Sequence, residues 1–291
     1  MQKRNTREIR SKDGTAIAFN RIGDGHPLIL IDGALCYRDL GPSRELAELL
    51  GRHFTVFTYD RRGRGESTDT RPYAVERELE DIEAILNEAG GEAYAWGLSS
   101  GAVLALEAAS RLDGITKLAL YEAPFIVDAS RPTTQDDWVR IDTAVARNQR
   151  GEAIKLFMQS VGLPRLMVRL MQLTPIWSKL KRVAHTLPYD GAIVKENQLG
   201  KPLSATQWAG VKIPTLVMSG GKSAEWMRRA NQELAGVLPN AKHQTLEGQT
   251  HHVKPKAHAP ALVEFFTSST RGQNRIESPG VPTFPRRVAH P

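Results

Sequence analysis

The sequence predicts an α/β protein with a mostly parallel central sheet and helices on both faces. Short apolar runs such as 27–31, 54–59 and 117–121 alternate with helix-forming segments along most of the chain. Continuous apolar strands are typical of a parallel sheet that is covered on both sides. With 291 residues, the chain can form one large domain or a domain with an insertion.

The predicted elements follow one another at short intervals. Two strand-like runs, 6–10 and 15–21, flank Asp13-Gly14, a dipeptide that favours a hairpin turn. The later strands are predicted at 27–31, 54–59, 92–96, 117–121, 213–218 and 243–246. The helices are predicted at 43–50, 75–89, from Ala102 onward, at 225–237 and at 257–266, where apolar residues recur every three to four positions.

The segment 128–210 has a different pattern. Its apolar residues recur at helical spacing, prolines divide it into short pieces, and no strand alternation is evident. This pattern predicts a helical cap inserted into an α/β core formed by 1–127 and 211–269. Residues 270–291 are rich in Ser, Thr, Pro, Gly and Arg without periodicity, which predicts a flexible tail.

Charge and composition argue against several classes of protein. The net charge of +7 is concentrated at the ends, because 1–10 and 271–291 each carry four basic residues and one acidic residue. No nucleic-acid-binding motif accompanies this charge, so we expect no nucleic-acid partner. No apolar run is long enough to span a membrane, and no signal-peptide core is present, so we expect no membrane partner. Cys36 is the single cysteine, which excludes an internal disulfide and favours a cytoplasmic protein.

Residues 97–101 read Gly-Leu-Ser-Ser-Gly and match the pattern Gly-x-Ser-x-Gly around Ser99. An apolar strand precedes the motif, and the strong helix former 102–109 follows it. A sharp turn between strand and helix presents the Ser hydroxyl above the sheet, and Gly is required where the backbones pass closely. This context predicts that Ser99 is a nucleophile and not part of an ordinary Gly/Ser loop.

Several polar residues follow the carboxyl ends of predicted strands. They include Asp32, Ser99, Glu122 and His251. In open α/β sheets, sites form beyond these strand ends. We therefore expect these residues to lie near one another.

A nucleophilic Ser needs a base, and in this architecture the base is a His after the last strand. His251 and His252 both qualify. We favour His251 because it completes Gly-x-x-His from Gly248. His243 and His258 are expected to be surface residues.

The oxyanion of an acyl-transfer reaction requires backbone N–H donors. One donor is expected from Ser100, the residue after the nucleophile. Gly33 or Ala34, in the loop after strand 27–31, can supply the other. We assign this donor to Gly33, which allows close approach, and expect Ala34 to contact the substrate.

The carboxylate that orients the His departs from the usual pattern. An Asp most often follows the strand 213–218, but Ser223 occupies that place. Glu225 comes two residues later, in the first turn of a helix, where an acid suits the helix dipole. We favour Glu122, at the end of the strand after the nucleophile helix, because a triad is defined by geometry and not by chain order. Glu225 stays the alternative.

These motifs resemble those of the α/β-hydrolase superfamily over residues 10–268. Residues 60–67 read Asp-Arg-Arg-Gly-Arg-Gly-Glu-Ser, similar to the superfamily's Asp-x-x-Gly-x-Gly-x-Ser loop, which is structural there. The resemblance implies an α/β-hydrolase fold with an inserted cap. Some haloalkane dehalogenases carry Met-Glu where this chain has Tyr121-Glu122, but they use an Asp nucleophile. Ser99 therefore argues against dehalogenation.

Zearalenone lactone hydrolases resemble the chain more closely. They carry a segment similar to Trp-Gly-Leu-Ser-Ser-Gly-Ala at 96–102, Asp-Gly as at 32–33, and Glu-x-Pro as at 122–124. Their cap contains Pro-Val-Trp, similar to Pro-Ile-Trp at 175–177. The resemblance implies that Glu122 is the acid and that Trp177 contacts the substrate.

Together these observations predict a metal-independent serine hydrolase without a cofactor. It would cleave a small apolar carboxylic ester or lactone, including a zearalenone-type macrolactone, through an acyl-enzyme, as a monomer or homodimer. Ser99 attacks, His251 carries the proton and Glu122 orients the ring. Two other classes stay open, namely a cofactor-free perhydrolase or C–C lyase on the same scaffold, and a binding protein without catalysis.

Overall fold

The computed structural model describes residues 6–268, which contain an eight-stranded sheet in the order β1-β2-β4-β3-β5-β6-β7-β8. The first two pairings, β1 with β2 and β2 with β4, are antiparallel, and the remaining pairings are parallel. The strands are β1 (Arg7–Arg10), β2 (Ala16–Ile22), β3 (His26–Ile31), β4 (Phe54–Tyr59), β5 (Ala93–Leu98), β6 (Ile115–Tyr121), β7 (Thr215–Gly220) and β8 (Ala241–Leu246). This sheet confirms the predicted fold class.

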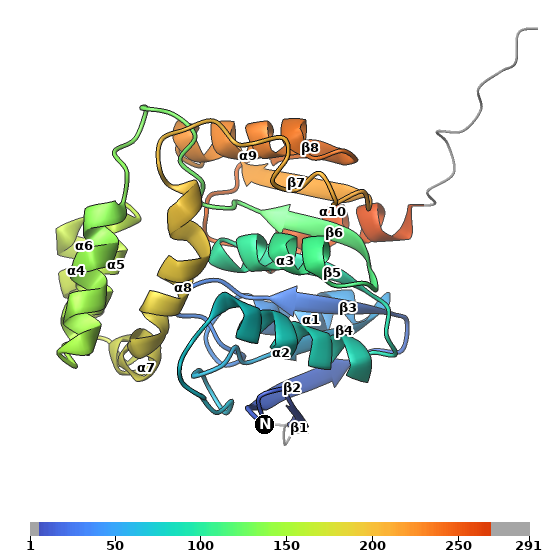
Figure 1. The fold of residues 1–291 in the computed structure, drawn as a ribbon, viewed down its shortest axis with the longest axis horizontal. Helices are drawn as coiled ribbons and strands as arrows, with labels where there is room; N and C mark the ends of the chain where they lie inside the picture. Colours follow the sequence, from blue (N-terminus) through green and yellow to red (C-terminus); the bar gives the residue numbers. More distant parts are fainter. Residues whose placement is uncertain (1–5, 269–291) are drawn as a thin grey trace, which may run out of the picture.

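Helices cover both faces of the sheet (Figure 1). One face carries α2 (Val75–Glu88), α3 (Ser100–Arg111) and α9 (Glu225–Val237), and the other carries α1 (Ser43–Leu50) and α10 (Pro255–Thr267).

Residues 28–31 of the central strand β3 are all apolar and all buried. Ile29 and Ile31 belong to the buried cluster that includes α2 and α3 side chains, whereas Leu28 and Leu30 belong to the cluster that includes α1 and α10 side chains. Successive strand residues point to opposite faces, so the part of a strand that is covered on both sides buries consecutive side chains.

Most of the segment between β6 and β7 is helical. Its elements are α4 (Gln135–Ala146), α5 (Arg150–Ser160), α6 (Arg165–Met171), α7 (Pro175–Val183), η1 (Ala184–Thr186), α8 (Leu187–Val194) and η2 (Lys195–Asn197). Pro164 lies just before α6, and Pro175 and Pro188 lie in the first turns of α7 and α8. A proline lacks the N–H that the first turn of a helix leaves unpaired anyway, so these residues start helices without cost.

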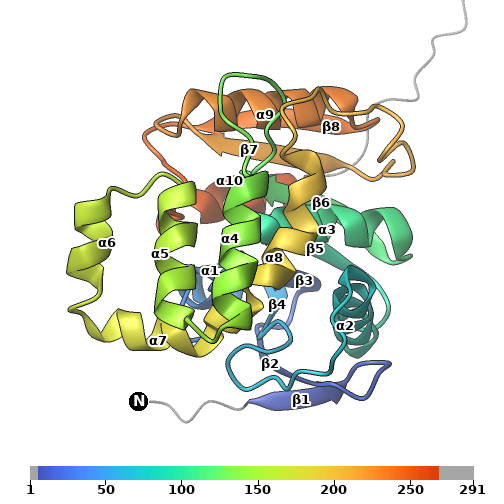
Figure 2. The same cartoon turned by 60° about the vertical axis from the view of Figure 1, so that its left-hand side comes forward.

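The α8 helix lies between the sheet and the outer helices α4–α7. Figures 1 and 2 both show it crossing the carboxyl ends of the central strands. Its buried residue Leu187 packs in the same apolar cluster as Val103 of α3 and Ile141 of α4. The inserted helices are therefore joined to the α/β core through α8.

Several element boundaries agree with the sequence patterns to the residue, among them those of α1, β4 and α9. The strand β7 instead ends two residues later than predicted, at Gly220. The predicted tail at 270–291 lies outside the described residues. Between residues 6 and 268, no helix combines the length and apolar character needed to cross a membrane.

Candidate active site

Ser99 lies in the turn between β5 and α3, with a backbone φ of 55° and ψ of −125°. A positive φ is unfavourable for a residue with a side chain, and such strain concentrates at functional sites. The Ser99 N–H donates to Tyr121 O at 2.9 Å, which fixes the turn against the end of β6. Ser99 also occupies the N-cap position of α3, without a side-chain cap hydrogen bond, where the helix dipole favours negative charge.

The two glycines of the motif allow this turn to form. A Cβ at Gly97 would lie 2.4 Å from Gly101 O, and a Cβ at Gly101 would lie 2.3 Å from Ile31 O. Both contacts are with backbone, which cannot move aside as a flexible side chain can. The spacing Gly-x-Ser-x-Gly is therefore a packing requirement of this strand–turn–helix unit.

Glu122 and His251 are directly hydrogen-bonded, although 129 positions separate them in the chain. The Glu122 Oε2 atom lies 2.7 Å from His251 Nδ1, and Glu122 Oε1 accepts the Gly220 N–H at 2.7 Å. The carboxylate is fully buried, whereas the His251 side chain is 45% exposed. A buried carboxylate that accepts from Nδ1 would fix the ring and leave Nε2 as the other reactive atom.

The loop that carries His251 is anchored just before the His. The Tyr121 hydroxyl donates to Thr250 O at 2.6 Å, and the Lys222 N–H donates to Gln249 O at 2.8 Å. A Cβ at Gly220 would lie 2.5 Å from Gln249 O, so the loop lies directly on the end of β7. The loop is therefore held both by Tyr121, the residue before Glu122, and by the end of β7, the strand beside Glu122.

The structure brings together the ends of β5, β6 and β7, but it does not join every predicted residue. Ser99 lies one hydrogen bond from Tyr121, the residue before Glu122, and Glu122 is bonded to His251. Within residues 6–268, no hydrogen bond links the Ser99 hydroxyl to His251. Catalytic hydrogen bonds often tighten only when a substrate is bound.

Gly33 lies against the turn that carries Ser99. A Cβ at Gly33 would be 3.0 Å from Ser99 Cβ and 3.7 Å from Ser100 Oγ. The Gly33 carbonyl accepts from Arg64 Nη1 at 2.7 Å. Since the C=O and N–H of a trans peptide point in opposite directions, this bond directs the Ala34 N–H away from Arg64. Within the described residues, the N–H groups of Gly33, Ala34 and Ser100 donate no hydrogen bond.

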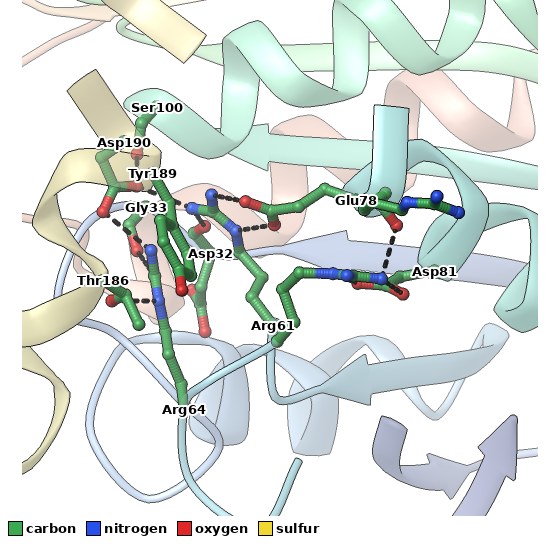
Figure 3. Close-up of polar contacts among 12 residues, drawn as sticks. Asp32, Gly33, Arg61, Arg64, Glu78, Asp81, Ser100, Thr186, Tyr189 and Asp190 are labelled. Atoms are coloured by element: carbon green, nitrogen blue, oxygen red, sulfur yellow. Dashed lines mark hydrogen bonds and ion pairs between the residues drawn. The ribbon is translucent and has the colours of Figure 1, made fainter. Parts of the chain in front are cut away.

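A buried ionic network lies beside Gly33 and Ser100 (Figure 3). Arg61 forms two bonds of 2.6 Å to the Glu78 carboxylate and one of 2.8 Å to Asp190 Oδ1. Arg64 donates to Asp190 Oδ2 at 2.7 Å. The Ser100 hydroxyl donates to Asp190 Oδ1 at 2.8 Å. Asp190 belongs to α8, so the network joins the inserted helices to the turn after Ser99.

Asp190 and Asp32 have opposite pKa shifts. Burial alone would raise the pKa of Asp190, but Arg64 and Arg61 outweigh it and hold the pKa below the ordinary value. Burial raises the pKa of Asp32 to about 6. The Asp32 Oδ1 atom has no hydrogen-bond partner in the described part of the chain. Asp190 is therefore ionised at neutral pH.

The alternative site residues lie elsewhere. The Glu225 side chain is 75% exposed and pairs with Arg229 at 3.0 Å, one helical turn away. Ser223 is buried, and a Cβ at Gly220 would lie 2.8 Å from its Oγ, which indicates a confined space at that position. His252 is exposed and follows the anchored residues of the loop. These placements favour Glu122 and His251 over the alternatives.

The expectation for His258 was wrong. The side chain is fully buried in α10, and its ring meets the Tyr121 ring edge-on, with centroids 4.3 Å apart. Burial lowers the pKa of His258 to about 4, against the opposing charge of Glu122. His243 is half-buried and its Nε2 lies 3.0 Å from Ser219 Oγ. The sequence gives no signal for the burial of His258 except its place between apolar residues of an amphipathic helix.

Trp177 packs within the inserted helices. Its side chain is 8% exposed and lies 3.8 Å from the Cβ position of Gly151 on α5. It lines an open hollow of about 910 Å³ whose other lining residues belong to the segment 148–181. Ser99, Glu122 and His251 do not line this hollow. A contact between Trp177 and the substrate stays a prediction.

No group of three or more His, Cys, Asp or Glu side chains within residues 6–268 could hold a metal ion. The arginines of the segment 60–67 are engaged by acids and carbonyls of the protein itself, as the resemblance implied.

Comparisons with known proteins agree with this architecture. Residues 23–262 match the model of the alpha/beta hydrolase family. A solved structure of an alpha/beta hydrolase from Sphaerobacter thermophilus is 50% identical, with a TM-score of 0.83 over 90% of this chain and 100% of that one. A hydrolase from Pseudomonas aeruginosa is 21% identical, with a TM-score of 0.70 over 91% of this chain and 99% of that one, which shows the fold alone.

A curated relative, the uncharacterized hydrolase YraK from Bacillus subtilis, is 27% identical over 147 residues. The match spans 49% of this chain and 54% of that protein, so it covers about half the length of each. The family match, in contrast, covers both the segment that carries Ser99 and the one that carries His251. The chain therefore belongs to the alpha/beta hydrolase family.

Proposed function

We propose that this protein is a serine hydrolase that cleaves a carboxylic ester or lactone. The observation that carries the proposal is the 2.7 Å bond between buried Glu122 and His251 Nδ1, beside a Ser held at φ 55° on the neighbouring strand end. A nucleophile, a base and a carboxylate that orients the base are the three groups that acyl transfer by serine requires.

In the proposed reaction, Ser99 Oγ attacks the carbonyl carbon while its proton passes to His251 Nε2. Glu122 holds the ring through Nδ1 and stabilises the imidazolium that forms. The tetrahedral intermediate then collapses, and the departing alkoxide takes the proton from His251. A water molecule attacks the acyl-enzyme, gives its proton to the same Nε2, and releases the acid as Ser99 regains its proton. A lactone would leave as a single hydroxy acid, because the leaving alkoxide stays attached.

The developing oxyanion would be stabilised by backbone N–H groups of Ser100 and of the Gly33–Ala34 segment. A Cβ at Gly33 would lie 3.0 Å from Ser99 Cβ, so the segment is close to the nucleophile. The N–H groups of this segment and of Ser100 donate to no other described residue. Removal of one such donor in a comparable site costs about 10²–10³ in kcat. The Ala34 N–H, which points away from Arg64, is a second candidate donor beside the Gly33 N–H.

The proposed substrate class is that of apolar esters and lactones. Support comes from the resemblance of 96–102 and 122–124 to the zearalenone lactone hydrolases. The macrolactone is the more specific part of the proposal and is tested separately from the chemistry.

The test is turnover of p-nitrophenyl esters and of a resorcylic macrolactone by the wild-type protein and by Ser99→Ala. We expect wild-type turnover that Ser99→Ala abolishes, with the folded state of the variant checked by circular dichroism. Peracid formation with hydrogen peroxide but no hydrolysis would support the perhydrolase instead. Equal turnover by wild type and Ser99→Ala, or none by either, would overturn the proposal. Hydrolysis of linear esters alone would reject only the macrolactone.

A further inference from the structure

Asp190 of α8 lies at the junction of the inserted helices and the groups that would hold the oxyanion (Figure 3). We infer that Asp190 is a positioning residue for the oxyanion site, acting through Ser100 on one side and through Arg64 and Gly33 on the other. This inference rests on the proposed function, because it assigns a role within the same site.

The first connection is direct. The Ser100 hydroxyl donates to Asp190 Oδ1 at 2.8 Å, and both side chains are buried. Ser100 is the first residue of α3, so its own N–H has no partner within the helix. The side chain and the N–H share one Cα, and the bond to Asp190 therefore restricts how this N–H can rotate.

The second connection runs through Arg64. Its Nη2 donates to Asp190 Oδ2 at 2.7 Å, while its Nη1 donates to Gly33 O at 2.7 Å. Thr186 Oγ1 accepts from Arg64 Nε at 3.0 Å and fixes the plane of the guanidinium. A guanidinium is a rigid fork, so the position of Asp190 sets the orientation of the Gly33–Ala34 peptide.

The charges of the network make this arrangement rigid. Arg61 and Arg64 face Glu78 and Asp190, and all four side chains are at least 98% buried. Lifting α8 away would separate Asp190 from two buried cations, which is far more costly than breaking a surface pair. The oxyanion donors are therefore fixed before substrate arrives, as electrostatic stabilisation of a transition state requires.

A neighbouring contact shows what an ordinary anchor of α8 looks like. Tyr189 precedes Asp190 on the same helix, and its hydroxyl donates to Asp69 at 2.8 Å. This bond also joins α8 to the core, but among the described residues neither side chain forms a hydrogen bond or ion pair with Ser100, Arg64 or Gly33. Tyr189→Phe therefore serves as the matched control for loosening α8 without releasing the oxyanion segment.

The test compares Ser100→Ala with Tyr189→Phe in the full chain on a p-nitrophenyl ester. Ser100→Ala keeps the backbone N–H and removes the bond to Asp190. We expect kcat to fall about tenfold with KM nearly unchanged, less than loss of a whole donor costs. The inhibition constant of phenylboronic acid, which forms a tetrahedral adduct, should rise by the same factor. Tyr189→Phe should keep kcat and this constant within about twofold, whatever its effect on Tm.

A double-variant cycle identifies Asp190 as the partner. If Ser100 acts through Asp190, adding Ser100→Ala to Asp190→Ala, which leaves no acceptor for the Ser100 hydroxyl, should lower kcat no further than Asp190→Ala alone. Where Asp190→Ala fails to fold, the comparison of Ser100→Ala with Tyr189→Phe decides.

Equal kcat in Ser100→Ala and wild type would overturn the inference, as would equal losses in Ser100→Ala and Tyr189→Phe. Additive losses in the cycle would also overturn it. Failure of the proposed function looks different, because the wild-type protein itself would then show no turnover that depends on Ser99.

Discussion

The two sides of the candidate site are held in different ways. On the base side, buried Glu122 bonds to a His251 whose side chain is 45% exposed, on a loop anchored by hydrogen bonds to its backbone. On the oxyanion side, Gly33 and Ser100 are held by Arg64 and Asp190, two fully buried and oppositely charged side chains.

The difference matches what each side has to do. A base must accept and release a proton, so it needs an accessible ring and a fixed partner. Oxyanion donors must keep their orientation and charge during the reaction, so they benefit from a rigid network that excludes water. Since Arg64 and Arg61 hold the pKa of Asp190 below its ordinary value, its charge is present throughout the pH range in which a His titrates. Asp190 should therefore add no pH dependence to activity in this range, whereas Asp32, which precedes Gly33 and whose pKa burial raises to about 6, titrates within it.

The largest expected effect on kcat comes from neutralising Glu122, the carboxylate that bonds to His251. Glu122→Gln should lower kcat at least about a hundredfold, because the neutral amide cannot stabilise the imidazolium and disfavours the correct tautomer. Steady-state turnover of a p-nitrophenyl ester measures it. Glu225→Gln is the matched control and should stay near wild type, since within residues 6–268 the exposed Glu225 pairs with Arg229 on its own helix and not with His251. A greater loss in Glu225→Gln than in Glu122→Gln would contradict the assignment of the acid.

A smaller effect should follow from loosening the loop that carries His251. Tyr121→Phe removes the 2.6 Å bond to Thr250 O and should lower kcat about three- to tenfold, the worth of one hydrogen bond, with KM little changed. The chain offers a control in Tyr59, which is also buried but whose hydroxyl has no partner among the described residues. Tyr59→Phe should leave kcat unchanged. Equal kcat values in Tyr121→Phe and Tyr59→Phe would contradict a role for the bond to Thr250.

The smallest effect on activity is expected for His258, whose substitution should instead change the free energy of unfolding at low pH. Burial lowers the pKa of His258 from 6.5 to about 4, so the unfolded chain binds a proton in this interval that the folded protein does not. Stability from this group is complete above pH 6.5 and falls as the pH drops toward 4, by up to about 3 kcal/mol.

His258→Phe keeps an aromatic ring against Tyr121 and should remove this acid-dependent loss while leaving kcat at pH 8 near wild type. Urea unfolding of both proteins at several pH values between 4 and 7 measures the effect. An identical pH dependence of the unfolding free energy in the two proteins would show that His258 is not the group concerned.

The sequence predicts most of the local structure because local patterns determine it. Helix α1 has its apolar residues on one face, β4 consists of aromatic and β-branched residues, and both have the predicted bounds. The prediction of Glu122 rested on its place at a strand end, and the structure brings it to His251 because parallel strands end on the same edge. The bond from Gly220 could not be foreseen, since β7 extends two residues beyond its apolar run.

The features that the sequence does not reveal depend on contacts distant in the chain. The arginines of 60–67 bond within the protein, in agreement with a structural role for this loop. No local pattern, however, connects Arg61 to Asp190, 129 positions later. Ser100 was assigned a backbone role only, because its side-chain partner lies on an inserted helix. His258 lies in a helix whose buried face includes Ala259 and Leu262, and only the packing of α10 against the sheet shows that the His faces inward as well.

The central claim is that Ser99 is the nucleophile, and covalent labelling tests it most directly. The wild-type protein would be treated with a fluorophosphonate and digested with trypsin, which releases residues 78–111 as one peptide. Fragmentation of this peptide distinguishes Ser99 from the adjacent Ser100. We predict a single adduct on Ser99 that forms much more slowly in His251→Ala. An adduct on Ser100, or none on this peptide, would contradict the account.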